Sequence, residues 1–133
     1  MPVLSAGNES EIDTAFSGMV QQQIDALLVA SDAFFFWQRS QLASLAARLR
    51  IPAIYYLREF AVAGGLMTYG NNLPDAFHLL GGYVGRVLKG EKPADLPVQQ
   101  SAKFEFVVNM KTANALGLTV PNSIQLLADE IIE

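Results

Sequence analysis

The chain has 133 residues, of which 51% are hydrophobic and 17% charged, with a formal net charge of −4, no cysteine and one histidine. This length suits one domain or part of a larger one. The composition excludes disulfides, thiolate metal centres, a cysteine nucleophile and a multi-histidine zinc site, and the absence of a Lys/Arg run argues against nucleic-acid binding. Soluble domains carry about 25% charged residues, so we expect something else to cover part of this surface.

The first half of the chain predicts alternating helices and strands. Helices are expected over 8–23 and 37–50, where apolar residues recur at helical spacing. The short apolar runs 25–30 and 51–56 are typical of strands that are covered on both faces of a parallel sheet. Helix, strand, helix and strand with short joints form the βαβ pattern, which predicts an α/β fold.

The second half predicts shorter elements separated by Gly and Pro. The expected elements are a helical turn at 60–63, a strand at 66–69, a helix at 72–89, an extended connector at 91–100, a strand near a sheet edge at 103–108, a short helix capped by Asn109 and ended by Gly117, and a final amphipathic helix from Ser123. Gly81, Gly82 and Gly85 fall inside the helix 72–89 and cost roughly 1 kcal/mol each against Ala. We therefore expect another backbone to pack closely on that face.

Polar residues follow the two strands of the first half. Ser31 and Asp32 come after the first strand, and Arg58 and Glu59 come shortly after the second. In open α/β sheets, ligands bind outside the carboxyl ends of the strands. Alternatively, Ser31 or Asp32 only caps the following helix. The aromatic run 34–37 comes directly after Asp32, and at least one of its four rings is expected to face a cleft or a partner while core packing takes the majority.

Motifs for nucleotide and hydrolase chemistry are absent. The sequence contains neither Gly-x-Gly-x-x-Gly, nor a Walker phosphate loop, nor a Gly-x-Ser-x-Gly elbow. His78 is interpreted as a structural or surface residue rather than a catalytic one. We therefore predict no enzyme activity, no cofactor and no metal site.

Several segments together carry a family resemblance. The stretches 25–32, 51–55, 58–60, 63–67 and 69–70, followed by 85–100, 103–109 and 115–121, resemble the ABC transporter substrate-binding protein family, which includes tryptophan-type and other uncharacterised solute receptors. The similarity covers nearly the whole chain, and Lys-Gly-Glu-Lys-Pro-Ala-Asp-Leu-Pro at 89–97 is its most specific part.

The resemblance implies a type I periplasmic binding protein, in which two Rossmann-like lobes close on a small solute. A full receptor is more than twice this long, so the chain is expected to be a truncated, C-terminal portion that lacks the first lobe, the signal peptide and the strand–helix start of the second lobe. By analogy, 1–65 and 101–133 belong to the second lobe, and 66–100 forms the crossing segment and a helix of the first lobe.

The same resemblance implies that polar groups at strand ends hold the ligand. The candidate ligand-binding residues are Ser31, Asp32, Tyr56, Arg58, Glu59 and Tyr69. Asp32 or Glu59 would pair with a ligand amine and Arg58 would clamp a carboxylate, while the aromatic residues near Asp32 would suit an aromatic or apolar body.

Three functions remain open from the sequence. The first is the solute-binding component of an ABC importer, which takes a small organic solute such as an amino acid or aromatic acid and meets an ABC permease. The second is a self-associating truncated domain, a homo-oligomer with a scaffold or sensor role, whose interface holds the glycine-bearing helix or the run 34–37. The third and least favoured is a flavodoxin-like enzyme. The resemblance implies a periplasmic location, whereas an N-terminus without a basic or long apolar region predicts a cytoplasmic one for the chain as given.

Overall fold

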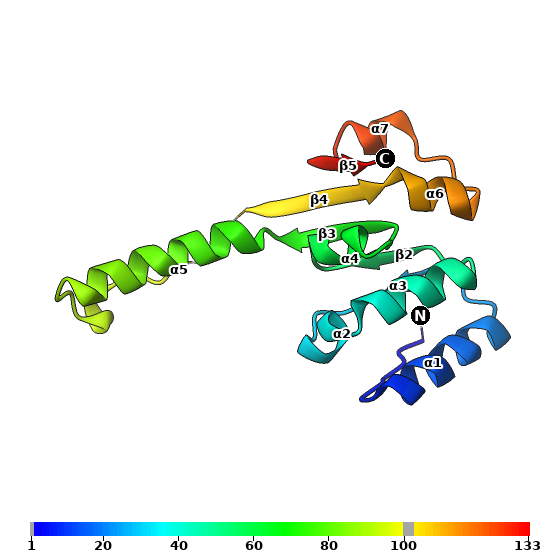
Figure 1. Cartoon of the computed structure of the whole chain (residues 1–133), viewed down its shortest axis with the longest axis horizontal. Coiled ribbons are helices and arrows are strands. Elements are labelled where there is room, and N and C mark those ends of the chain that lie inside the picture. The colour runs from blue at the N-terminus through cyan, green and yellow to red at the C-terminus, as the bar shows by residue number, and fades with distance from the viewer. Residues whose placement is uncertain (1, 100–102) are drawn as a thin grey trace.

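The computed structural model describes residues 2–99 and 103–133, which form a mixed α/β body with one projecting helix (Figure 1). The strands are β1 (Leu27–Leu28), β2 (Ala53–Tyr55), β3 (Met67–Asn71), β4 (Phe104–Asn109) and β5 (Glu130–Ile132). The helices are α1 (Glu9–Gln21), α2 (Ala33–Trp37), α3 (Arg39–Arg48), α4 (Arg58–Val62), α5 (Leu73–Leu88), α6 (Met110–Leu116) and α7 (Asn122–Gln125), with a 3-10 turn at Pro93–Asp95.

The described strands form one mostly parallel sheet in the order β1-β2-β3-β4-β5. Only the pair β3–β4 is antiparallel, and the other three neighbouring pairs are parallel. The N-terminal segment and α1 lie at the β1 end of the body, and the C-terminus lies at the β5 end (Figure 1). The predicted α/β class with a Rossmann-like sheet is confirmed.

The helix boundaries follow capping residues that the sequence identified. Asn72 accepts a hydrogen bond from the Asp75 amide at 2.9 Å and begins α5. Asn109 accepts one from the Thr112 amide at 3.0 Å and begins α6. Gly117 ends α6 with φ 73°, a left-handed conformation that glycine adopts without steric cost.

Two hydrophobic cores hold the body together. The larger one joins α1, α3 and β2, and in it the rings of Tyr55 and Phe60 stack with centroids 4.7 Å apart. Burial without a hydrogen-bond partner among the described residues raises the pKa of the Tyr55 phenol above its ordinary value. The smaller core packs Val108 of β4 against Ala113 of α6 and Val120. Such buried apolar contacts supply the main driving force for folding.

Asn109 links these parts through three hydrogen bonds. It is 5% exposed, and its amide donates to the carbonyl of Leu66 at 2.8 Å. Its side-chain Nδ2 donates to the carbonyl of Ala61 at 3.0 Å, while its Oδ1 caps α6. One buried polar side chain thus fixes the end of β4 against the end of α4 and the start of α6, because a buried amide with these groups unpaired would be costly.

The final amphipathic helix predicted from Ser123 is wrong. Only the turn α7 forms there, and Glu130–Ile132 is the strand β5, which pairs in parallel with β4. The Asp129 carboxylate accepts a hydrogen bond from the Phe106 amide at 2.7 Å, and the Asp129 amide donates to the Phe106 carbonyl at 2.8 Å. Pairing with β4 overrides the helical spacing, as tertiary context often does over short segments.

The prediction that residues 25–30 form a strand covered on both faces is also wrong. Within the described chain β1 is an edge strand of two residues, and Leu28 is 65% exposed. Helices cover the other side of this strand, where Leu27 packs against the larger core.

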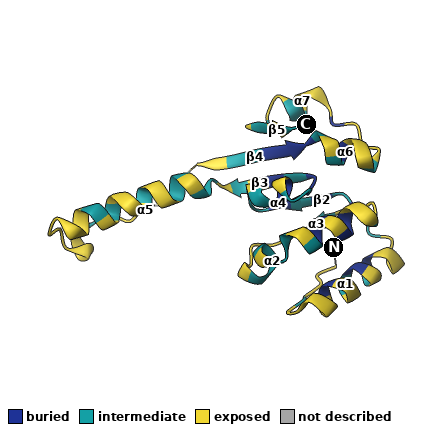
Figure 2. Ribbon diagram, in the orientation of Figure 1, coloured by how far each residue is buried: buried dark blue, intermediate teal, exposed yellow. Residues whose placement is uncertain are grey.

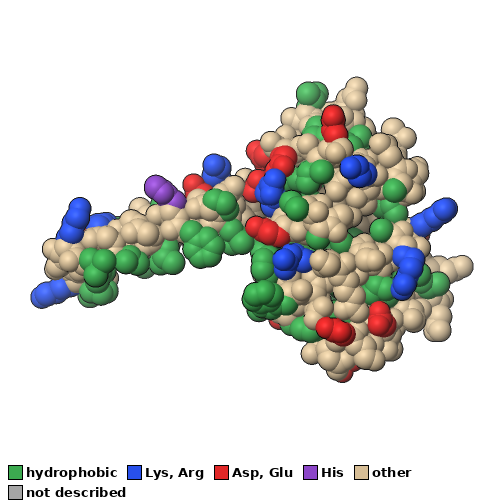
Figure 3. Space-filling model, viewed as in Figure 1, with side chains coloured by type: hydrophobic (Ala, Val, Ile, Leu, Met, Phe, Trp, Pro, Cys, Tyr) green, Lys and Arg blue, Asp and Glu red, His purple; other side chains and the backbone are tan. Residues whose placement is uncertain are grey.

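Helix α5 projects away from the body, and none of its residues is buried (Figures 1 and 2). Apolar side chains gather along one side of it, and charged ones lie on the other (Figure 3). The exposed apolar residues are Phe77, Leu80, Val84, Val87 and Leu88. None of the helices in the described ranges is long and apolar enough to span a membrane.

The expected backbone packing against the α5 glycines does not occur within the described residues. A Cβ placed at Gly81, Gly82 or Gly85 would meet no atom within 4 Å. The propensity cost of these glycines therefore has no compensating contact with the residues that the structure describes.

The division of the chain near residue 66 stays a prediction. Strand β3 pairs with β2 through Met67 and Thr68, whereas 69–71 pair with β4 only. The strand thus begins inside the sheet and ends as half of a two-stranded ribbon, from which α5 departs (Figure 1).

An ion pair connects the start of α4 to β5. The Arg58 guanidinium donates through Nε and Nη2 to the two Glu130 carboxylate oxygens, both at 2.6 Å, and its Nε lies 3.9 Å from Glu105. The hydrogen bonds from Arg58 lower the pKa of Glu130 below its ordinary value. A carboxylate whose pKa is lower in the folded chain stabilises the fold above its unfolded pKa, and this contribution is lost as the pH falls through the folded pKa.

We predict that Glu130→Gln lowers the free energy of unfolding by about 0.5–1 kcal/mol at pH 7, since the pair is partly exposed and solvent screens it. The difference should disappear in urea titrations at a pH below the folded pKa of Glu130, where the wild-type carboxyl is neutral as well. Glu133→Gln is the charge-matched control. An equal loss at both pH values would contradict the electrostatic explanation.

We predict opposite effects for two glycine substitutions. A Cβ at Gly70 would collide with the backbone carbonyl of Tyr56, so Gly70→Ala should destabilise the fold by about 1–3 kcal/mol. Gly81→Ala lies in open space within α5 and should stabilise the chain by up to about 1 kcal/mol. Urea unfolding followed by circular dichroism measures both. A harmless Gly70→Ala would show that β3 does not pass this close to Tyr56.

Candidate functional site

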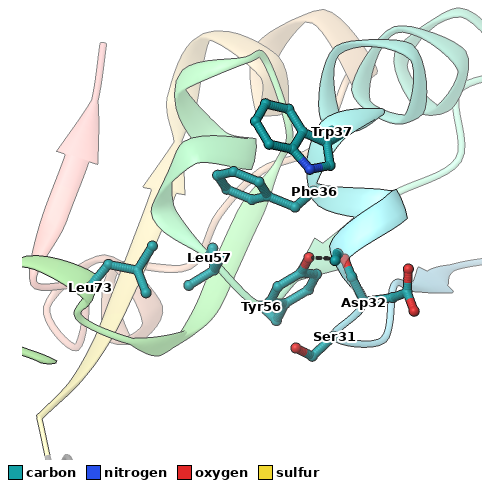
Figure 4. Close-up of a pocket in the computed structure, with 8 residues that line it drawn as sticks. Ser31, Asp32, Phe36, Trp37, Tyr56, Leu57 and Leu73 are labelled. Carbon is teal, nitrogen blue, oxygen red and sulfur yellow. Dashed lines mark hydrogen bonds between the residues drawn. The ribbon is translucent and has the colours of Figure 1, made fainter. Parts of the chain in front are cut away.

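The candidate site lies where β1 and β2 end. Ser31 and Asp32 follow β1, and Tyr56 and Leu57 follow β2, so neighbouring parallel strands bring them to the same edge of the sheet. A pocket of about 260 Å³ opens there (Figure 4). Its lining residues are Ser31, Asp32, Ala33, Phe36, Trp37, Tyr56, Leu57 and Leu73.

Asp32 caps the helix that carries the aromatic wall of this pocket. Its Oδ1 accepts hydrogen bonds from the amides of Phe34 at 2.7 Å and Phe35 at 3.4 Å. Figure 4 shows the carboxylate directed away from Tyr56, whereas the Asp32 main chain faces the tyrosine. Asp32 therefore caps α2, and the cap sets the direction of this helix.

Tyr56 closes one side of the pocket. Its hydroxyl donates to the carbonyl of Asp32 at 2.6 Å and so joins the two strand ends (Figure 4). Partial burial, together with the nearby Asp32 charge, raises the pKa of Tyr56, so the hydroxyl stays protonated at neutral pH and remains a donor.

Aromatic and aliphatic side chains form the rest of the wall. Phe36 is half-buried and Trp37 is 75% exposed, and their rings meet edge to face at 6.0 Å. The Arg39 guanidinium lies 4.9 Å from the centroid of the Phe36 ring and donates to the Phe36 carbonyl at 2.9 Å, and both contacts hold Phe36 in place. An exposed indole beside polar strand ends presents a flat apolar surface with a polar rim.

The other candidate residues do not line this pocket. Arg58 holds Glu130 instead of facing the cavity. The Oε2 atom of Glu59 is buried without a hydrogen-bond partner among the described residues. Tyr69 stacks on Phe104 with ring centroids 5.6 Å apart, on the ribbon that leads to α5. Three of the six candidates, Ser31, Asp32 and Tyr56, therefore come together at one pocket.

Three of the lining residues, Ala33, Leu57 and Leu73, carry no signal in the sequence. Leu57 and Leu73 are ordinary leucines at the starts of α4 and α5, and nothing in their local sequence marks them. They line the pocket only because the tertiary fold brings the starts of α4 and α5 next to α2. The aromatic run 34–37 was the one signal that pointed to the apolar wall.

The chain is similar to solved structures that are more than twice as long. A Streptococcus pneumoniae structure, described as an ABC domain in complex with L-Trp, matches with 27% identity and a TM-score of 0.86, covering 98% of this chain and 45% of the other. A conserved domain protein from Vibrio cholerae matches at 19% identity and a TM-score of 0.84, covering 95% of this chain and 42% of its own.

A third solved structure has a lower structural similarity. It is a ligand-free, open substrate-binding protein with adhesive properties from Clostridium difficile, with 23% identity and a TM-score of 0.66, covering 96% of this chain and 42% of the other. The chain thus spans less than half the length of these three proteins. No curated protein matches it.

The comparison with family descriptions covers almost every residue. The family described as ABC transporter substrate binding protein matches residues 2–132. Both the sequence match and the arrangement of the sheet agree with the resemblance derived from the sequence. The chain belongs to the ABC transporter substrate-binding protein family.

Proposed function

We propose that this chain is a solute-binding part of an ABC importer, and that it binds a small organic solute such as an amino acid or an aromatic acid. The observation that carries the proposal is the pocket at the ends of β1 and β2, where the Phe36–Trp37 wall lies beside polar groups. The L-Trp in the 27% identical Streptococcus structure supports an aromatic or apolar ligand body. The solute would then pass to an ABC permease from a periplasmic or extracellular receptor, without any catalytic step.

The pocket is open to solvent on one side. Strand ends and α2 form its floor and one wall, and Leu73 at the start of α5 contributes to a second wall. We infer that a second lobe faces this surface in a receptor of full length and that the solute lies in the cleft between the lobes. Pockets that enclose most of a ligand bind more tightly than open ones, so the isolated chain should bind the same solutes more weakly.

The polar candidates take separate roles in this proposal. The hydroxyl groups of Ser31 and Tyr56 offer hydrogen bonds to the ligand. The Oδ2 atom of Asp32 makes no hydrogen bond within the described ranges, so it is available to a ligand ammonium group. Arg58, Glu59 and Tyr69 lie beyond the pocket wall and would contact the solute only where the cleft extends toward α5 or the second lobe.

Trp37 provides the direct test, since it is the single tryptophan of the chain and lines the pocket. We predict that L-Phe, added to the purified chain, changes the Trp37 emission in a saturable way and raises the melting temperature. Trp37→Ala should weaken binding of L-Phe by at least tenfold in calorimetry, because an aromatic contact of this kind contributes about 1 kcal/mol or more beyond its buried area. Leu126→Ala, at another exposed apolar residue, is the control. Unchanged affinity in Trp37→Ala would refute the proposed wall.

Asp32 allows its charge to be separated from its cap. Asp32→Asn keeps a side-chain oxygen for the α2 amides and should leave the unfolding free energy within about 0.5 kcal/mol, whereas Asp32→Ala should lose about 1 kcal/mol. If the carboxylate binds an ammonium, Asp32→Asn weakens L-Phe binding by about tenfold or more and leaves binding of phenylpropionate, which lacks the amine, unchanged. Asp95→Asn, near the far end of α5, serves as the charge-matched control. Equal affinities for L-Phe would show that Asp32 acts only as a cap.

The exposed side of α5 favours the second candidate function, a self-associating domain with a scaffold or sensor role and no transport activity. Its apolar residues lie in one stripe, and contiguous exposed stripes of this kind are typical of interaction surfaces. Sedimentation of the chain at rising concentration tests it: a dimer that dissociates in the double variant Leu80→Glu and Val84→Glu would support it. A wild-type monomer at high concentration would leave the receptor as the better proposal.

A further inference from the structure

One carboxylate outside the solute pocket contacts both of the segments that carry its leucines. Glu105 of β4 does not line the pocket, and its side chain is 17% exposed. Leu57 and Leu73 line the pocket from the starts of α4 and α5 (Figure 4). Each leucine is the sequence neighbour of a residue that lies near Glu105: Arg58 in one case and Asn72 in the other.

The sheet places Glu105 beside the chain that leaves β2. Glu105 is the cross-strand partner of Gly70, so both residues face the same side of the sheet. A Cβ at Gly70 would collide with the carbonyl of Tyr56, which shows that the chain after β2 passes over this side of the β3–β4 ribbon. The missing side chain of the glycine therefore lets the chain bring Arg58 close to Glu105.

The first contact of Glu105 holds the start of α5. Its Oε2 atom accepts a hydrogen bond from Nδ2 of Asn72 at 3.0 Å, in a partly buried position. The Oδ1 atom of the same asparagine caps α5 through the Asp75 amide at 2.9 Å, and its backbone amide donates to the carbonyl of Lys103 at 3.0 Å. Because both ends of its side-chain amide are bound, Asn72 keeps one orientation, and Leu73 is the next residue.

The second contact acts on the start of α4. The Oε1 atom of Glu105 lies 3.9 Å from Nε of Arg58, whose two side-chain hydrogen bonds go to Glu130. Solvent screens this attraction, since the Arg58 side chain is 42% exposed. The bond from Asn72 is the stronger of the two contacts, because a short hydrogen bond to a charged acceptor is worth more than a longer, screened ion pair.

We propose that Glu105 is a positioning residue of the solute pocket, which holds Leu57 and Leu73 in place through the residues beside them. The carboxylate lies outside the pocket lining and acts chiefly through Asn72, with a smaller contribution through Arg58. A binding site loses fit when its wall shifts by about 0.5 Å, so the affinity for the solute depends on this support. The inference rests on the proposed function, because it names the support of that same pocket.

The first test of this proposal needs no solute. Aromatic rings shift the NMR signals of nearby methyl groups, and the pocket that Leu57 and Leu73 line has an aromatic wall. We expect Glu105→Ala to move the methyl resonances of Leu73 strongly and those of Leu57 less. Glu105→Gln should restore both, because its amide oxygen still accepts from Asn72.

The second test measures solute affinity through the Trp37 emission, with L-Phe as the probe. Glu105→Ala should weaken binding by about fivefold or more, and Glu105→Gln should stay within about twofold of the wild type. Glu91→Ala is the matched control, since Glu91 also accepts hydrogen bonds from an arginine, but near the far end of α5. It should change neither the affinity nor the methyl resonances of the pocket leucines.

A double-mutant cycle identifies the shared contact. Asn72→Ser keeps a side-chain oxygen to cap α5 but removes the donor to Glu105. Its effect on the affinity should equal that of Glu105→Ala, and the double variant should bind within about twofold of either single variant, because both remove the same hydrogen bond. Circular dichroism checks that the variants are folded. If Glu105→Ala does not fold, Asn72→Ser takes its place in both measurements.

Three results would overturn the proposal. The first is a folded Glu105→Ala chain whose Leu57 and Leu73 resonances stay at their wild-type positions. The second is a Glu105→Gln chain that loses as much affinity as Glu105→Ala, and the third is a double variant in which the two losses multiply. A wild-type chain that does not bind L-Phe would instead contradict the proposed function, and the methyl resonances would still decide the role of Glu105.

Discussion

The fold depends on the hydrogen bonds of one buried asparagine. Asn109 ends β4, caps α6 and binds the carbonyl of Ala61 at the end of α4. Its amide also pairs with Leu66, just before β3. Because α4 follows β2 directly, this residue ties the C-terminal third of the chain to the strand that ends at the pocket. The position of Tyr56 therefore depends on a contact made more than fifty residues later in the sequence.

Local signals predicted the fold wherever a single segment decides its own structure. The caps of α5 and α6 were readable because a side-chain oxygen and the amide three residues later form a short-range contact. The strand β5 could not be predicted from local signals, because 130–132 pair with a strand more than twenty residues away. Only this tertiary partner selects strand over helix. The exposure of Leu28 was missed for the same reason, since burial of a strand depends on its neighbours in the sheet.

The candidate site was predictable to the level of strand ends. The rule that ligands bind outside the carboxyl ends of parallel strands pointed to Ser31 and Asp32, the family resemblance added Tyr56, and the structure brings all three to one pocket. The rule does not say which way a side chain points. Arg58 and Tyr69 turned to Glu130 and Phe104, and neither partner is close in the sequence. Side-chain pairing across elements is the information that a single sequence lacks.

The ribbon formed by the ends of β3 and β4 has a mechanical consequence for α5. Helix α5 is 16 residues long, which corresponds to about 24 Å, and no buried side chain braces it against the body. Its direction is therefore set by two short strand ends, where the stacked rings of Tyr69 and Phe104 lie. The assembly is a lever with its fulcrum at the ribbon: a rotation of about 10° there moves the far end of α5 by about 4 Å. Leu73 lies both at this fulcrum and in the pocket wall, so it would move least. Motion of α5 would therefore leave the shape of the solute pocket almost unchanged.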